Sequence, residues 1–219
     1  MMSDNTLILR KIIVVFSALI YWTGVIIHAR QIRRRTGRSP NVRPAGLREN
    51  MLWAGWFFVI AGWIGQPFIL KNHAKDILFS FIDALSQPSW IIPGVLIAVF
   101  GYAGTLWCYA ALGDSWRMGI NRKENVVLIK NGPYQFVRHP IYLFQITILT
   151  GMIFLLPTLF SFMILLINIV CVAIKALDEE AYLTNIHGSE YRRYMSYTGM
   201  LLPKIKNFLR CLFLFDSFL

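Results

Sequence analysis

Residues 139–174 read HPIYLFQITILTGMIFLLPTLFSFMILLINIVCVAI and contain no Asp, Glu, Lys or Arg. One helix over these 36 residues would be about 54 Å long, whereas a hydrocarbon core of roughly 30 Å needs only about 20 residues. Pro157 lies near the middle of the stretch, and proline interrupts a helix. The stretch therefore predicts a tight helical hairpin with two legs of about 17 residues, each barely a full crossing.

Three further stretches, residues 12–29, 50–70 and 84–113, also lack charged side chains. In the third, Pro88 and Pro93 suit the entry turn or first helical turn, which predicts a helix from about Trp90 to Leu112. Hydrophobic residues make up 56% of the chain and charged residues only 15%, a composition that excludes disordered, coiled-coil and ordinary soluble proteins. We expect an all-α integral membrane protein with about five transmembrane helices, the last two forming the hairpin.

The basic residues predict how these helices are oriented. Residues 30–48 contain seven arginines and no acidic residue, and such a loop lies on the cytoplasmic side. Because successive helices alternate in direction, residues 114–138 and the chain from Lys175 onward lie on the same side. These three cytoplasmic segments contain 18 of the 22 basic residues. The N-terminus is expected outside and the C-terminus in the cytoplasm. Short loops without extra domains favour a bacterial inner membrane over the endoplasmic reticulum.

Two segments outside the spans are apolar enough to lie on a membrane surface. Residues 71–87 mix charges with apolar side chains and predict a short helix on the outer surface, and residues 207–219 predict an aromatic tail at the inner interface. We divide the chain into residues 1–89, with two helices, the arginine-rich loop and this outer segment, and residues 90–219, which form a helical core with a polar cytoplasmic cap.

Several classes of chemistry have no support in the sequence. The cysteines Cys108, Cys171 and Cys211 are widely spaced, so neither a disulfide framework nor a metal site is expected. No dinucleotide-binding glycine motif, P-loop, zinc-protease or hydrolase motif occurs. The net charge of +11 would suit a nucleic-acid-binding protein, but the chain is too apolar for that class.

Polar residues gather at one end of the predicted hairpin. Arg138 and His139 precede Pro140 at the start of the fourth span, and Glu179 and Glu180 follow the end of the fifth. Pro140 suits the first position of a helix, where free backbone N–H groups and the helix dipole favour an anion. A hairpin would bring the two pairs together at a site for a carboxylate or phosphate. The alternative is that Arg138 reaches lipid phosphate and the glutamates only neutralise Lys175.

Three motifs around this point carry a resemblance to a known family. They are NGPYQFVRHPIY at residues 131–142, EEAYL at 179–183 and HGSEYRRY at 187–194. Their order and their position around a hairpin resemble the isoprenylcysteine carboxyl methyltransferase family, which shares its GPY, RHPxY and EE elements with phospholipid N-methyltransferases. The resemblance covers roughly residues 100–205.

The resemblance implies a methyltransferase that uses S-adenosylmethionine at the cytoplasmic cap and a lipophilic or lipid-like acceptor from the bilayer, with a prenylcysteine carboxylate as one candidate. A sulfonium is already a good leaving group, so no metal is required. The candidates for catalysis are Arg138 and His139 of the motif, with Tyr197 at a position where the family has another residue. The residues that the resemblance assigns to the cofactor are Tyr134, Val137, Arg138, His139, Pro140, Tyr142, Glu179, Glu180 and Tyr191, with Tyr194 a further aromatic candidate.

The sequence departs from the family pattern at three points. Phe144 replaces the glycine of RHPxYxG, which is expected to reshape the pocket, and His187 replaces the phenylalanine of an FG pair. Residues 197–199 read YTG where many members have RVP, whose arginine is thought to orient a carboxylate substrate. We therefore expect a neutral or protonated acceptor in preference to a free carboxylate.

Two other functions fit the same spans. One is a membrane oxidoreductase of the sterol-reductase type with a nicotinamide cofactor. The other is a non-catalytic adaptor that works through the arginine-rich loop and anionic lipid.

Overall fold

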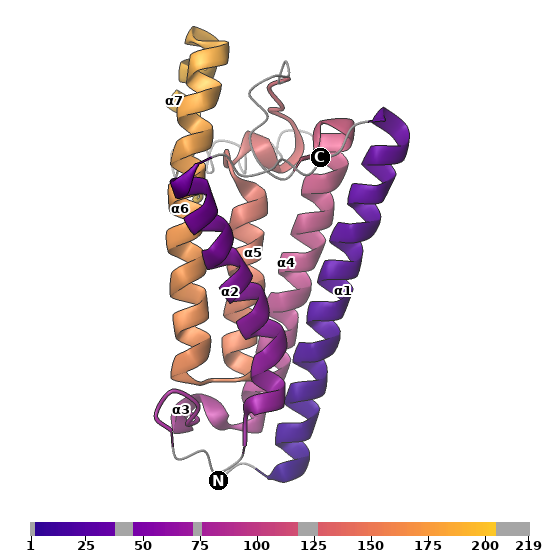
Figure 1. Cartoon of the computed structure of the whole chain (residues 1–219), viewed down its shortest axis with the longest axis vertical. Coiled ribbons are helices and arrows are strands. Elements are labelled where there is room, and N and C mark those ends of the chain that lie inside the picture. Colours follow the sequence, from indigo (N-terminus) through magenta and orange to yellow (C-terminus); the bar gives the residue numbers. More distant parts are fainter. Residues whose placement is uncertain (1–2, 38–45, 72–75, 118–126, 205–219) are drawn as a thin grey trace, which may run out of the picture.

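The computed structural model describes residues 3–37, 46–71, 76–117 and 127–204, and these are helical with irregular connections (Figure 1). Four helices are long and apolar enough to cross a membrane: α1 (Asp4–Thr36), α2 (Leu47–Ile69), α4 (Ile91–Leu112) with its flanking turns, and α6 (Leu159–His187). A shorter apolar helix, α5 (Pro140–Leu155), completes the bundle. Their outward faces stay apolar, as lipid contact requires, and the predicted all-helical membrane fold is confirmed.

The predicted hairpin is formed by α5 and α6. Only Leu156, Pro157 and Thr158 separate the two helices, and the Thr158 hydroxyl caps α6 by accepting from the Ser161 N–H. Pro140 is the first residue of α5, as predicted, and α4 starts one residue after the expected Trp90. The short connection fixes α5 and α6 as antiparallel neighbours.

Glycines allow α4 and α5 to pack closely. A Cβ atom on Gly101 would lie 2.6 Å from the Ile148 side chain, and one on Gly104 only 2.2 Å from the ring of Phe144. Small residues of this kind let membrane helices approach each other. The Phe144 ring fills the space opposite Gly104 and is not among the residues that line the cavity described below, so its effect on the pocket stays a prediction.

Two helices extend beyond the charge-free stretches. α1 continues to Thr36, so the first four arginines of the expected loop are helical, and Gly37 ends the helix in the left-handed conformation. α6 continues to His187, so Glu179 and Glu180 lie inside the helix and do not follow its end. Residues 30–36 and 175–187, beyond the charge-free stretches, contain no proline or glycine, so hydrogen bonding along each helix continues past the apolar part.

The segment expected to form an outer surface helix is mostly irregular. Within the described part of residues 71–87, α-helix is confined to α3 (Asp83–Ser86). The segment instead pairs with the connection of the hairpin, since Phe81 bridges Thr158 and the Ile82 N–H donates to the Pro157 carbonyl. The predicted tail at 207–219 lies outside the described residues.

A buried arginine of α1 connects the C-terminal end of α5 with the chain before α4. Arg10 is 0% exposed, although the sequence suggested only an outer charge. Its guanidinium donates to the carbonyls of Phe154 and Leu155 at the end of α5, and to those of Ser86 and Gln87 before α4. A cation at the C-terminus of α5 complements the helix dipole and holds three segments together.

Candidate active site

The RHP segment is held by the chain that follows α7 (Ser189–Tyr197). Val137 forms a parallel bridge with Gly199, and the N–H groups of Arg138 and His139 donate to the carbonyls of Gly199 and Met200 at 2.9 and 3.1 Å. A Cβ on Gly199 would collide with the Leu202 carbonyl oxygen, so glycine permits this turn. The YTG departure from the family pattern therefore supports the RHP segment directly.

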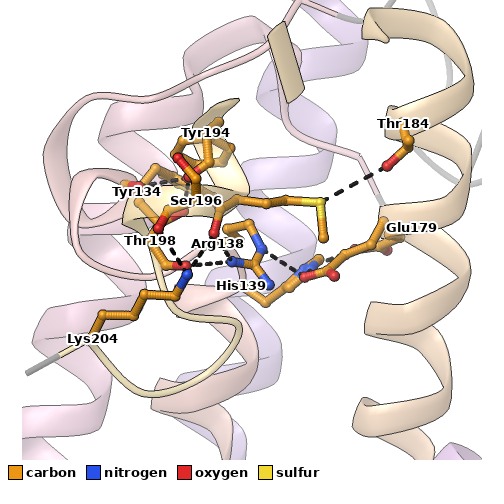
Figure 2. A network of polar contacts seen from close by, with 11 residues as sticks. Tyr134, Arg138, His139, Glu179, Thr184, Tyr194, Ser196, Thr198 and Lys204 are labelled. Atoms are coloured by element: carbon orange, nitrogen blue, oxygen red, sulfur yellow. Dashed lines mark hydrogen bonds and ion pairs between the residues drawn. The ribbon is translucent and has the colours of Figure 1, made fainter. Parts of the chain in front are cut away.

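The Arg138 guanidinium donates hydrogen bonds to other residues of the chain (Figure 2). Its Nε donates to Glu180 at 2.7 Å, and Nη1 donates to the Thr198 carbonyl. The two charged side chains are only 8% and 10% exposed, so they form a buried ion pair. Lys204 donates to the carbonyls of Met195 and Ser196 nearby, and the two cations together satisfy the C-terminal end of α7. In this conformation Arg138 orders the cap.

His139 lies between the two glutamates. Its Nδ1 is 3.3 Å from Glu179 and its Nε2 is 3.3 Å from Glu180, while its ring stacks on Tyr142 with centroids 5.7 Å apart. Burial alone would lower the pKa of His139, but hydrogen bonds and charges of both carboxylates outweigh it and raise the pKa above its ordinary value. Tyr142 donates to Glu179 at 2.8 Å. The predicted meeting of the RHP segment and the glutamates is thus observed.

A cavity of about 540 Å³ opens beside this polar cluster. Of the residues assigned from sequence, Tyr134, Arg138, His139, Tyr142, Glu179, Tyr191 and Tyr194 line it. Val137, Pro140, Glu180 and Tyr197 do not line it. Val137 and Pro140 position their neighbours through the backbone, and Glu180 binds Arg138. Tyr197 is 43% exposed and packs edge-on against Tyr194, so its predicted catalytic role has no support from its position.

The opposite wall of the cavity comes from helices that the sequence did not connect with the site. It is apolar and aromatic, and its side chains from α1 and α2 are Tyr21, Trp22, Val25, Trp53, Trp56, Phe57 and Ile60. Trp116 and Lys175 also line the cavity. Tryptophan within apolar spans was the available signal, but the same residues are common at membrane interfaces and do not by themselves indicate a site.

Besides His139 Nε2, which is 3.3 Å from Glu180, three buried donors on the cavity wall have no hydrogen-bond partner among the described residues. They are the Tyr191 hydroxyl and the indole N–H groups of Trp22 and Trp56. Burial, together with the charge of Glu180, raises the pKa of Tyr191, so its hydroxyl stays protonated and can donate. Buried polar groups are normally hydrogen-bonded, so these donors are available to water or to a ligand in the cavity.

Comparison with known proteins identifies the region that carries this cluster. Residues 94–185 match the model of the isoprenylcysteine carboxyl methyltransferase (ICMT) family, from the first turn of α4 through both glutamates of α6. No match to the chain was found among curated proteins. The matched region excludes α1 and α2, which supply the aromatic wall. Residues 94–185, with the hairpin and its polar cluster, are therefore similar to the isoprenylcysteine carboxyl methyltransferase family.

Proposed function

We propose that the protein is an S-adenosylmethionine-dependent methyltransferase that acts on a lipophilic acceptor within a bacterial inner membrane, with the polar cluster at the cytoplasmic face. One observation carries the proposal: a single cavity joins a cluster of charged and hydroxyl side chains to an aromatic wall. A cofactor with a charged amino acid moiety and an acceptor with an apolar body need these two environments side by side.

The residues around the cavity suit the cofactor chemically. S-adenosylmethionine carries an ammonium, a carboxylate, ribose hydroxyls and a sulfonium, and these need acceptors, donors and aromatic faces. Glu179 is the carboxylate on the cavity wall that can accept from the ammonium or the ribose, and Tyr191 offers an unpaired hydroxyl. Tyr134 and Tyr194 offer aromatic faces. Arg138, His139 and Glu180 hold this arrangement in place through their mutual contacts.

When bound, the cofactor would supply an electrophilic methyl group, whose carbon bonds to the acceptor as the carbon–sulfur bond breaks and sulfur keeps the electron pair. The chain's own contribution is alignment and the exclusion of water. Proximity of this kind supplies about 7–11 kcal/mol in well-oriented reactions. The buried ion pair and the close α4–α5 packing provide the rigid frame that alignment requires.

Cofactor binding tests the proposal most directly. Isothermal titration of the purified protein with S-adenosylhomocysteine should show saturable binding, and Glu179→Gln should weaken it about tenfold or more, equivalent to about 1.4 kcal/mol. Glu190→Gln is the matched control, because Glu190 pairs with Lys130 outside the cavity and its loss should leave affinity unchanged. Binding of NADPH without binding of S-adenosylhomocysteine would instead favour the oxidoreductase.

The acceptor can be found by product analysis. Protein incubated with methyl-labelled S-adenosylmethionine and a total lipid extract should transfer label to an apolar product, whose mass identifies the acceptor. Glu179→Gln protein is the negative control. Absence of transfer to any lipid or isoprenoid fraction would contradict a lipophilic acceptor.

A further inference from the structure

Lys175 is a buried cation that the proposed cofactor site does not use. It lies on α6, lines the cavity and is only 7% exposed. Its ammonium forms no hydrogen bond or ion pair with any described residue. The sequence alternative in which Glu179 and Glu180 merely neutralise it does not hold, because Glu179 contacts Tyr142 and His139 while Glu180 contacts Arg138 and His139.

The other basic groups on the cavity wall have partners. Arg138 binds Glu180 and backbone carbonyls, and His139 lies between both glutamates. Arg117 also has an interaction. An unpaired charge held away from water is costly, and an anionic partner offsets that cost. Among the described basic residues of the wall, Lys175 is therefore the cation available to a bound anion.

The position of Lys175 separates it from the polar cluster. It precedes Glu179 by four residues, which is about one helical turn or 6 Å along α6, on the side of the bilayer interior. Gln145 of α5 and the aromatic side chains of α1 and α2 line the same cavity. A molecule that reaches Lys175 along this wall places its apolar body against tryptophan and phenylalanine and its charged end below Glu179.

We propose that Lys175 binds a carboxylate or phosphate group of the acceptor, whose apolar body lies against Trp53, Trp56 and Phe57. This inference rests on the proposed function and assigns the residue that would recognise an anionic acceptor, a class that includes the prenylcysteine carboxylate of the family. It replaces the expectation of a neutral or protonated acceptor, which rested on the absence of an arginine at residue 197. The ammonium of Lys175, reached through the cavity, can take the place of that arginine.

Tryptophan fluorescence can test the proposal, because Trp22, Trp53, Trp56 and Trp116 line the cavity. The probes share one tail: farnesylthioacetate, its neutral primary amide, and farnesyl phosphate, each titrated in detergent with S-adenosylhomocysteine present. We expect at least one anionic probe to bind about tenfold or more tightly than the amide. Lys175→Met should abolish that preference, Lys175→Arg should retain it, and Lys130→Gln, a lysine outside the cavity, should leave it unchanged.

The anion at Lys175 could come from the acceptor or from the carboxylate of the cofactor, and titration with S-adenosylhomocysteine alone distinguishes the two. Lys175→Met should bind it like the unmodified protein, which also shows that the variant is folded. A tenfold loss in this titration would assign Lys175 to the cofactor and overturn the proposal, as would equal affinity for anionic and neutral probes or no saturable binding of either anion. An anion preference that depends on Lys175 without any cofactor binding would support the proposal while refuting the methyltransferase.

Discussion

Two arginines are buried at opposite ends of α5, and they differ in what surrounds them. Arg10, at the C-terminal end, contacts only backbone carbonyls, from α5 and from the chain before α4. Arg138, before the N-terminal end, contacts Glu180 and the carbonyls that end α7. Both guanidiniums connect segments distant in sequence, but only Arg138 lies beside ionisable side chains and a cavity.

The difference separates a structural arginine from one that shapes a site. Carbonyl dipoles satisfy Arg10 without any group that titrates or faces a ligand, so its removal should affect folding alone. At Arg138 the partner is a carboxylate that also contacts His139, and His139 contacts the cavity-lining Glu179. Changes at Arg138 should therefore reach the ligand, and the following variants test this distinction.

Arg138→Met should have the largest effect. It leaves Glu180 buried without its strongest partner, and breaking a buried ion pair from one side costs about 3–5 kcal/mol of stability. We also expect affinity for S-adenosylhomocysteine to fall about tenfold or more, because Glu180 would compete for His139 and displace Glu179. Thermal unfolding and calorimetry measure the two effects. Full affinity in protein that remains folded would show that the ion pair is only structural.

Arg10→Met should lower stability by about 2–4 kcal/mol, since charge-assisted hydrogen bonds to carbonyls at the end of α5 are lost. Affinity for S-adenosylhomocysteine in the folded fraction should not change. Lys11→Met is the control, because Lys11 donates only to the Leu70 carbonyl and should have a smaller effect. A loss of affinity in Arg10→Met without loss of stability would remove the distinction between the two ends.

Because of His139, the folding stability of the protein should depend on pH. Its pKa is raised in the folded state, so its contribution is complete below the unfolded value of about 6.5 and is lost as pH rises through the higher folded pKa. The melting temperature should therefore fall as pH rises above neutral, by less than Arg138→Met lowers it. In His139→Gln this part of the pH dependence should disappear. An unchanged profile would assign it to another group.

Tyr191→Phe and Tyr194→Phe should have the smallest effects, one on ligand affinity and the other on stability. Tyr191 lines the cavity and its hydroxyl is unpaired, so its removal should weaken S-adenosylhomocysteine binding by about 1 kcal/mol and leave stability unchanged. The Tyr194 hydroxyl donates to the Tyr134 carbonyl, so its removal should cost about 1 kcal/mol of stability and leave affinity unchanged. The reverse pattern would mean that the unpaired hydroxyl does not mark the ligand site.

The sequence by itself determined the hairpin and the composition of one site. A charge-free stretch twice too long for one crossing, with Pro157 at its middle, permits few arrangements, and Pro140 marks where α5 begins. These local constraints suffice to bring Arg138 and His139 to Glu179 and Glu180. They did not determine where α1 and α6 end, because charged side chains do not stop a helix, and these two continue to Gly37 and Gly188.

Only the tertiary structure decided what the other polar residues do. Arg10 and Lys175 look alike in sequence, as single basic residues near apolar spans, yet one is saturated by carbonyls and the other faces a cavity without a partner. The aromatic wall likewise combines α1 and α2 with a hairpin more than 70 residues away. The cost of burying a polar group depends on partners that packing brings from distant segments, and sequence spacing does not specify those partners.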